Sequence, residues 1–270
     1  MTIKHPKKRL GQNFLTDKNV ARKIVASADI SSPRLIIEIG PGKGVLTEFL
    51  LPVCEQYVGI EIDGDLAGHL KDRFSRYDNF TLIESDFLQV DLAEIISNYA
   101  QPNTAVIGNI PYNITSPILF KLFDNADILD QAVLMMQKEV GQRLVARMGS
   151  KDYGLLAING QLFTDVKSLF HVRARLFFPQ PQVDSSVLRF NFKKGIRESF
   201  SDFELFRKIL RHCFQHRRKM LRKTLSMLFS STLLSKLGAD LTRRPEQLSI
   251  DDWRELTDLI YLHLREESRS

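Results

Sequence analysis

The sequence predicts an α/β protein in which a mostly parallel sheet of about seven strands precedes a small all-helical domain. From residue 34 to about residue 192, short apolar runs alternate with segments of helical length, which is the pattern of repeated βα units. After Gly195 no such run returns, and apolar residues recur at spacings of three and four. We therefore expect two domains, residues 1–195 and residues 196–270.

Five apolar runs are predicted to form the parallel part of the sheet, because nearly unbroken apolar strands fit a sheet that is covered on both faces. They are residues 34–39, 57–62, 80–83, 104–107 and 131–136. Two further runs, residues 155–163 and 186–192, are separated by the proline-rich sequence FFPQPQVD. We expect these two runs to close the sheet as a hairpin-like pair of strands.

The predicted helical domain begins near Phe203, where apolar residues repeat with the period of a helix. Asp202 and Ser249 are residue types that cap helix N-termini. Gly238 and Pro245, which lie between them, are residue types that interrupt helices. We therefore expect helices after both capping residues.

The composition is that of an ordinary soluble globular protein. The chain has 270 residues, of which 43% are hydrophobic and 26% charged, which excludes a disordered chain and a disulfide-bonded miniprotein. No apolar run approaches the roughly 20 residues needed to cross a bilayer. The two cysteines, Cys54 and Cys213, lack metal-ligand spacing, so we expect no metal and a cytoplasmic protein.

Positive charge is concentrated in two segments. The formal net charge is +6, and residues 1–12 and 207–223 together hold twelve Lys and Arg residues with no Asp or Glu. Such segregation is typical of a surface that binds a phosphate-rich partner, although a solvated helix face is the alternative for the second segment. The residues predicted to contact RNA are Lys7, Lys8, Arg9, Arg217, Arg218, Lys219 and Arg222.

A glycine-rich turn follows the first predicted strand, in the sequence IIEIGPGKGVLT. Glycines at such a turn let the backbone approach a ligand closely, so Gly40 and Gly42 are candidate cofactor-binding residues. Val45 stands where the third glycine of the dinucleotide fingerprint would fall, which disfavours NAD. The spacing resembles that of S-adenosylmethionine (SAM) methyltransferases, while a purely structural turn is the alternative.

Polar residues stand at the ends of four predicted strands, where open α/β sheets bind their ligands. They are Glu38, Glu61, Asp86 and Asn109. Glu61 lies 21 residues after Gly40, where a carboxylate can accept hydrogen bonds from both ribose hydroxyls of a nucleoside. Asp86 can accept a hydrogen bond from an adenine amino group. Each residue alone could be a solvated polar side chain or a helix cap. The same position of all four, at the end of a strand, favours a nucleoside site.

The fourth strand ends in GNIPYNIT, and the tetrad from Asn109 to Tyr112 fits methylation of an exocyclic amine. The amino group of adenine is a poor nucleophile, because its lone pair is delocalised into the ring. The Asn109 side-chain oxygen and the Ile110 carbonyl could accept hydrogen bonds from its two N–H groups and thereby favour a pyramidal nitrogen. Pro111 would restrain the backbone, and the Tyr112 ring offers a surface on which an extruded base can stack.

Over its whole length the chain resembles the ribosomal RNA adenine N6,N6-dimethyltransferase family, and in particular its bacterial small-subunit branch. The motifs that carry the resemblance are LGQNFL (10–15), EIGPGKGVLT (38–47), GIEID (59–63), SDFL (85–88), GNIPYNIT (108–115), FFPQPQVDSSV (177–187) and HCFQHRRKMLRKTL (212–225). The resemblance implies a Rossmann-like methyltransferase sheet with SAM as cofactor. It implies cofactor contacts at Asn13, Leu15, Gly40, Glu61, Asp86 and Asn109, and target-adenine contacts at Asn109, Pro111, Tyr112 and Phe177.

The same resemblance implies a substrate and a partner. The substrate would be two adjacent adenosines in a hairpin loop near the 3′ end of 16S rRNA, and the partner an assembling 30S subunit. We expect a monomer without a membrane partner.

Three alternatives remain at this stage. A large-subunit rRNA methyltransferase of the macrolide-resistance type shares the tetrad, but the VDS sequence at 183–185 and the Q-x-R-R-K-x-L-R pattern at 215–222 favour the small-subunit enzyme. A DNA adenine methyltransferase is less favoured, because such enzymes usually resemble N/D-P-P-Y at the tetrad. A non-catalytic assembly factor is disfavoured by the intact glycine and Asn109–Tyr112 motifs.

Overall fold

The computed structural model describes residues 6–28, 35–100 and 103–268. The first residue of the first predicted strand and Lys4 of the first basic segment lie outside these residues. The chain forms two compact units: residues 1–142 with 163–194, and residues 143–162 with 195–270. Each unit has its own buried side chains, as described below.

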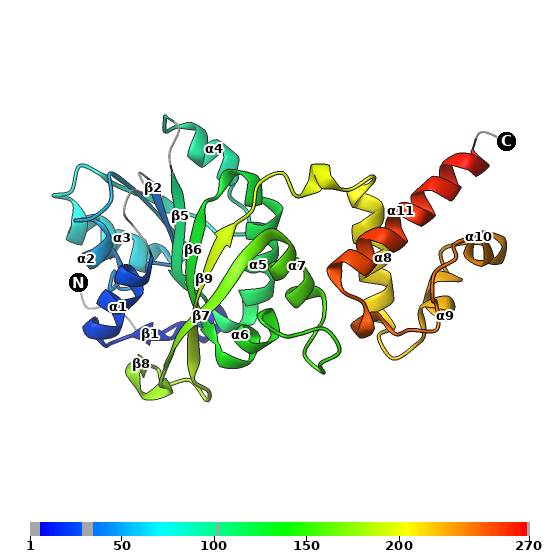
Figure 1. The fold of residues 1–270 in the computed structure, drawn as a ribbon. Helices are drawn as coiled ribbons and strands as arrows, with labels where there is room; N and C mark the ends of the chain where they lie inside the picture. Colours follow the sequence, from blue (N-terminus) through cyan, green and yellow to red (C-terminus); the bar gives the residue numbers. More distant parts are fainter. Residues whose placement is uncertain (1–5, 29–34, 101–102, 269–270) are drawn as a thin grey trace. The chain divides into compact units, whose positions relative to one another are not determined.

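Seven strands of the described chain form one sheet in the order β4-β3-β2-β5-β6-β9-β7 (Figure 1). The first five in this order are parallel, and β9 joins β6 and β7 by antiparallel pairing. Their bounds are β2 Leu35–Ile39, β3 Gln56–Glu61, β4 Phe80–Glu84, β5 Thr104–Asn109, β6 Gln131–Gln137, β7 Thr164–Val172 and β9 Ser185–Phe192. The expected mostly parallel α/β sheet is confirmed.

Helices lie on both sides of this sheet: in Figure 1, α1, α2 and α3 flank one side and α5 and α6 the other. All five residues of β2 are buried, as the unbroken apolar runs predicted for a covered sheet. Asp17 caps α1, since its carboxylate accepts hydrogen bonds from the Asn19 and Val20 amides. The helix bounds are α1 Lys18–Ser27, α2 Thr47–Leu50, α3 Gly64–Phe74, α4 Leu92–Ser97, α5 Thr115–Asp124 and α6 Lys138–Leu144.

Short elements complete the first unit. Strands β1 Phe14–Leu15 and β8 Phe177–Phe178 pair antiparallel outside the main sheet. Single 3-10 turns occur at η1 Lys8–Leu10, η2 Tyr112–Ile114, η3 Ala126–Ile128 and η4 Ala174–Leu176. The small β1–β8 sheet joins the N-terminal segment to the proline-rich loop.

The predicted strand over residues 155–163 is wrong, because this segment forms helix α7, Leu155–Phe163. The strand that pairs with β9 is instead the following segment, β7. An apolar run of nine residues fits either a buried helix or a buried strand, and periodicity alone cannot separate the two. The closing antiparallel pair therefore exists, but its first strand lies immediately after the predicted one.

The second unit is helical and contains α8 Phe203–Gln215, α9 Leu221–Leu225, α10 Ser231–Lys236 and α11 Ile250–Glu267, with 3-10 turns η5 Arg197–Ser199 and η6 Pro245–Gln247. Asp202 and Ser249 cap α8 and α11 as predicted. Trp253 is fully buried in this unit. Residues 143–162 also belong to it, whereas the sequence analysis had included them in residues 1–195. The Gly149 amide donates to the Glu246 carbonyl at 2.8 Å, which ties this segment to the helical unit.

The conformation of Gly44 in the glycine-rich turn leads to a stability prediction. Its φ is +74°, and an added Cβ would lie 2.6 Å from Phe74 Cε2, so Gly44→Ala strains the backbone and clashes with α3. We expect a loss of about 1–3 kcal/mol in the free energy of unfolding, measured by urea unfolding followed by circular dichroism. Gly68→Ala is the matched control, because Gly68 lies inside α3 with open space around it. The free energy of unfolding of Gly68→Ala should rise by about 0.5–1 kcal/mol. A Gly44→Ala variant as stable as the Gly68→Ala variant would contradict the prediction.

Candidate active site

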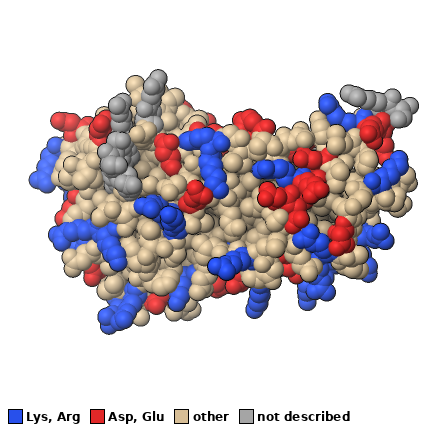
Figure 2. Space-filling model, in the orientation of Figure 1, with Lys and Arg blue, Asp and Glu red and all other residues tan. Residues whose placement is uncertain are grey.

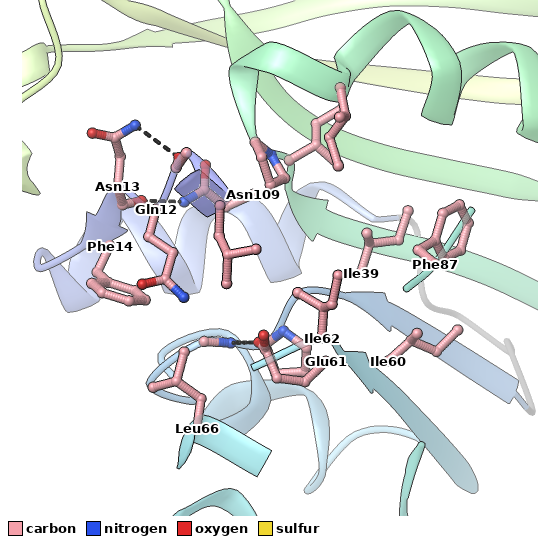
Figure 3. A pocket seen from close by; sticks show the side chains of 18 of the residues that line it. Gln12, Asn13, Phe14, Ile39, Ile60, Glu61, Ile62, Leu66, Phe87 and Asn109 are labelled. Atoms are coloured by element: carbon pink, nitrogen blue, oxygen red, sulfur yellow. Dashed lines mark hydrogen bonds between the residues drawn. The ribbon is translucent and has the colours of Figure 1, made fainter. Parts of the chain in front are cut away.

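A cavity of about 220 Å³ opens at the carboxyl ends of the parallel strands, within the first unit (Figure 3). Ligands of open α/β sheets bind at this edge. Three groups of residues line the cavity: the segment from Arg9 to Leu15, the glycine-rich turn, and the residues that end β2, β3, β4 and β5. The cavity thus brings together Asn13, Leu15, Gly40, Gly42, Glu61, Asp86, Asn109, Ile110, Pro111 and Tyr112 from the predicted site.

The glycine-rich turn forms an open cradle on one wall. Gly40 and Gly42 have φ of +59° and +61°, a region that favours glycine. A Cβ added to Gly40 would meet no heavy atom within 4 Å, so its open side is available to a ligand. A Cβ on Gly42 would come within 3.1 Å of the Phe14 ring. Any side chain at position 40 would project into this open space.

Glu61 ends β3 and is 4% exposed, yet its carboxylate is well supported by backbone donors. Oε2 accepts from the Gly42 amide at 2.9 Å, and Oε1 accepts from the Asp63 amide at 3.0 Å. Burial raises the pKa of Glu61, and these backbone hydrogen bonds oppose that shift. Each oxygen retains a further lone pair, so the carboxylate can still accept hydrogen bonds from ribose hydroxyls.

Glu38 is the penultimate residue of β2, an inner strand of the sheet, and is 1% exposed. Its Oε2 accepts hydrogen bonds from Thr47 Oγ1 and from the Tyr57 hydroxyl, both at 2.7 Å. Burial raises the pKa of Glu38 to about 7. These contacts show that Glu38 also has a structural role, because it joins β2, α2 and β3 beneath the cavity.

Asp86 follows β4 and lines the cavity. Its Oδ1 accepts from the Leu88 amide at 2.9 Å, and its Oδ2 has no donor among the described residues. Ile62, which is 49% exposed, and the buried Phe87 line the same cavity (Figure 3). Apolar side chains and one open carboxylate oxygen in the same cavity wall suit a purine that carries an amino group.

The N-terminal segment, residues 7–15, is clasped to the start of α3. Lys7 Nζ lies 2.5 Å from Asp63 Oδ1 and 2.9 Å from Asp65 Oδ2, and Gln12 Nε2 donates to Asp63 Oδ2 at 2.9 Å. Burial works against ionisation of Asp63, but the hydrogen bonds from Lys7 and Gln12 outweigh it and lower its pKa. The clasp holds Asn13 and Leu15 in the cavity wall.

Asn109 ends β5, and its side-chain amide is oriented by the N-terminal segment. Asn109 Nδ2 donates to the Asn13 carbonyl at 2.9 Å (Figure 3). A carbonyl can only accept, so the bond assigns the amide nitrogen to Asn13 and leaves Asn109 Oδ1 as an acceptor at the cavity. This is the acceptor that the amine-methylation hypothesis requires.

The main chain after Asn109 supplies a second acceptor. Thr115 Oγ1 donates to the carbonyls of Pro111 and Tyr112, at 3.1 and 3.3 Å. No hydrogen bond between described residues uses the Ile110 carbonyl, while the Ile110 amide donates to Met135 at 3.0 Å. The Ile110 carbonyl and Asn109 Oδ1 are therefore two acceptors on adjacent residues.

Tyr112 is held by a residue whose role the sequence analysis missed. The Tyr112 hydroxyl lies 2.7 Å from Ser185 Oγ, and Ser185 is fully buried at the start of β9. Burial raises the pKa of Tyr112, so its hydroxyl is neutral near pH 7. Ser185 belongs to the VDS sequence, which was used only to distinguish family branches. The bond restrains the Tyr112 ring at the cavity.

Phe177, which the family resemblance implies as a target-adenine contact, is not among the residues that line the cavity. It is 3% exposed and belongs to a hydrophobic cluster with Leu15, its partner in the β1–β8 pairing. Successive side chains of a strand point to opposite faces, and here Phe177 points to the core while Phe178 is 55% exposed. A sequence with two adjacent aromatics does not reveal which of them is buried.

The predicted RNA-contacting residues fall into two groups. Lys7 is engaged in the clasp, and Arg217 lies 3.6 Å from Glu246 and donates to the Ser150 carbonyl. Both cations support the protein's own structure. Arg9, Arg218, Lys219 and Arg222 are exposed, and no ion pair is found for them within the described part of the chain. The side chain of Lys8 lies outside what the structure describes.

Figure 2 shows Lys and Arg interspersed with Asp and Glu on the face in view. Among the described residues no group of three or more His, Cys, Asp and Glu side chains is placed to hold a metal ion. Cys54 and Cys213 are both buried thiols. None of the helices in the described ranges is both long and apolar enough to cross a membrane.

Comparison with known proteins identifies the family. The model of the ribosomal RNA adenine dimethylase family matches residues 3–261. The chain belongs to this family. Relatives of this chain are named ribosomal RNA small subunit methyltransferase A. That of Prosthecochloris aestuarii is 44% identical over 251 residues, 93% of this chain and 92% of its own length. That of Geobacter sulfurreducens is 41% identical over 258 residues, 93% of this chain and 94% of its own length.

Solved structures agree with this assignment. A dimethyladenosine transferase from Plasmodium falciparum has a TM-score of 0.77 at 27% identity, covering 94% of this chain and 98% of that one. The 23S rRNA methyltransferase ErmE, at 24% identity and a TM-score of 0.64, shares the fold over 92% of this chain and its own full length. As a member of the dimethylase family, this protein is an rRNA adenine methyltransferase with SAM as methyl donor.

The Tyr112–Ser185 bond leads to a kinetic prediction. Ser185→Ala and Tyr112→Phe each remove the bond, and each should lower kcat by about two- to tenfold through loss of ring orientation. The double variant should be no slower than the slower single variant, since the two changes remove one interaction. Ser186→Ala is the matched control, because Ser186 is also buried but bonds to His171 instead, at 2.8 Å. Fully additive effects in single-turnover methyl transfer would refute the assignment.

Proposed function

We propose that this protein dimethylates the N6 atoms of adenosines in the RNA of the small ribosomal subunit, with SAM as methyl donor. The orientation of Asn109 carries the proposal, because its Oδ1 is left as an acceptor beside a nucleoside-sized cavity. The relatives named above, which align over more than nine-tenths of this chain, are small-subunit rRNA methyltransferases by name.

The residues present fit SAM. The open cradle at Gly40 admits close approach of a ligand to the backbone, the Glu61 carboxylate suits a ribose diol, and Asp86 Oδ2 suits an adenine amino group. The N-terminal segment, fixed by the clasp, forms the remaining wall. When bound, SAM supplies a methyl group attached to a positively charged sulfur.

Asn109 and Ile110 are proposed to act on the target adenine. Asn109 Oδ1 and the Ile110 carbonyl accept hydrogen bonds from the two N6–H groups. These bonds favour a pyramidal nitrogen with its lone pair directed at the methyl carbon. The Tyr112 ring stacks on the extruded base, a contact worth roughly 1–3 kcal/mol. With SAM bound, N6 held in this way would accept the methyl group, and the proton that the methylated nitrogen loses would pass to solvent. Alignment and hydrogen bonding therefore carry the catalysis without a dedicated base.

We further propose the finer target that the family resemblance implies: two adjacent adenosines in a hairpin loop near the 3′ end of 16S rRNA, in the assembling 30S subunit. Unpaired loop bases are the usual targets of sequence-specific RNA recognition, since they can be extruded into a pocket. The protein would act as a monomer in the cytoplasm, without a metal. The VDS and Q-x-R-R-K-x-L-R sequences, together with the named relatives, favour this target over large-subunit RNA.

The experiment that tests the proposal is methyl transfer from labelled SAM to unmethylated small subunits, large subunits or duplex DNA, followed by nucleoside analysis. We expect N6,N6-dimethyladenosine in small-subunit RNA alone. Asn109→Ala should lower the transfer rate by about 10²- to 10³-fold, the usual cost of removing one group that stabilises a transition state. Label confined to large-subunit RNA would move the protein to the resistance-type enzymes. SAM binding without transfer to any substrate would favour an assembly factor.

RNA docking is proposed to use the exposed cations of residues 218–222. Changing Arg218, Lys219 and Arg222 together to Gln should weaken RNA binding while leaving SAM affinity unchanged. The slope of log K against log salt concentration should become shallower by about two to three, because each lost phosphate contact removes about 0.7–0.9.

The matched control changes three other exposed cations, Lys71, Arg76 and Lys236, to Gln and lowers the net charge equally. An equal loss of slope in both triple variants would show that residues 218–222 do not form a specific docking surface. Arg217 is left intact in both, because it bonds within its own unit.

A further inference from the structure

The loop after β4, residues 85–91, carries Asp86 and Phe87 into the cavity before α4 begins. Its own hydrogen bonds are local: the Gln89 amide donates to the Asp86 carbonyl, and the Leu88 amide donates to Asp86 Oδ1, both at 2.9 Å. The last bond to β3 is made by the Ser85 amide, which donates to the Glu61 carbonyl at 3.0 Å. The sheet therefore does not hold the loop beyond Ser85, and a contact from elsewhere is needed to fix it.

Lys121 of α5 supplies that contact. Its Nζ donates to the carbonyls of Leu88 and Val90, at 3.0 and 2.5 Å, and lies 5.6 Å from the centre of the Phe87 ring. Partial burial lowers the pKa of Lys121, and the nearby carboxylates of Asp91 and Asp86 oppose that shift. One ammonium group thus contacts the loop at three residues, Phe87, Leu88 and Val90.

We propose that Lys121 is a positioning residue for the cofactor site, which fixes Asp86 and Phe87 at the purine end of the cavity. The inference rests on the proposed contact of Asp86 with the adenine amino group of SAM. Lys121 does not line the cavity, so it acts through the loop. Helix α5 also begins three residues after Tyr112, so that one helix supports the target-base motif at its start and the cofactor loop near its end.

A positioning role differs from a general contribution to stability in what it does to ligand selectivity. If Lys121 fixes Asp86, its loss weakens binding of a ligand whose purine carries the 6-amino group more than binding of the deaminated ligand. If Lys121 merely stabilises the fold, both ligands lose affinity equally or not at all.

The test compares binding of S-adenosylhomocysteine and its deaminated analogue, S-inosylhomocysteine, by isothermal titration calorimetry. Lys121→Met keeps the aliphatic chain and removes the three N–H donors. We expect about tenfold weaker binding of S-adenosylhomocysteine and a much smaller change for the inosine analogue, as for loss of hydrogen bonds to a charged group. Lys121→Arg, which retains the charge and donors, should recover most of the affinity. Lys71→Met on α3 is the matched control and should leave both affinities unchanged.

The coupling to Asp86 completes the test. In an Asp86→Ala background, Lys121→Met should cause little further loss, because the oxygen that Lys121 positions is already absent. Equal losses in both backgrounds, or unchanged selectivity in Lys121→Met, would overturn the inference. If the Met variant does not fold, Lys121→Gln is measured against the same criteria. Failure of the unmodified protein to bind S-adenosylhomocysteine would instead count against the proposed function.

Discussion

A hydrogen bond between two asparagines joins the two halves of the site. Asn109 Nδ2 donates to the Asn13 carbonyl, across 96 residues of sequence, and thereby decides which end of the Asn109 amide faces the cavity. The Asn13 carbonyl is in turn placed by the Lys7 and Gln12 contacts to Asp63, whose amide donates to Glu61. Orientation of the target-amine acceptor thus depends on the same residues that close the cofactor cavity.

The sheet explains why these contacts can be made at one place. Parallel pairing of β4, β3, β2, β5 and β6 brings their carboxyl ends to a single edge, so that Glu61, Asp86 and Asn109 meet although they lie far apart in sequence. The strands supply rigid positions and the loops supply the functional groups. The backbone amides of Gly42 and Asp63 hold the buried Glu61 carboxylate in place through hydrogen bonds to its two oxygens.

Much of this arrangement could be predicted from sequence, because the positions of the strands and the polar residues at their ends follow from local patterns. The parallel strands, the helical C-terminal segment and several strand-end residues of the cavity wall follow from such patterns, whereas Asn13 and Leu15 were expected only from the family resemblance. The error at residues 155–163 arose because an apolar run has no period that separates helix from strand. The burial of Phe177 could not be predicted, because the face to which a strand residue points depends on the strand's partner, which is β1. Charge counting could not show that Lys7 and Arg217 bind their own protein, nor could spacing reveal Ser185 or Lys121, whose roles depend on contacts distant in sequence.

The central claim is that Asn109 Oδ1 accepts a hydrogen bond from the target adenine amine. The most direct test is a structure of the complex with S-adenosylhomocysteine and a small-subunit RNA fragment that contains the target loop, in which the contacts of the adenine N6 are measured. The account predicts N6 about 3 Å from both Asn109 Oδ1 and the Ile110 carbonyl, with Asn109 Nδ2 still bonded to Asn13. An adenine whose N6 points away from Asn109, or an Asn109 amide turned to offer its nitrogen to the base, would contradict it.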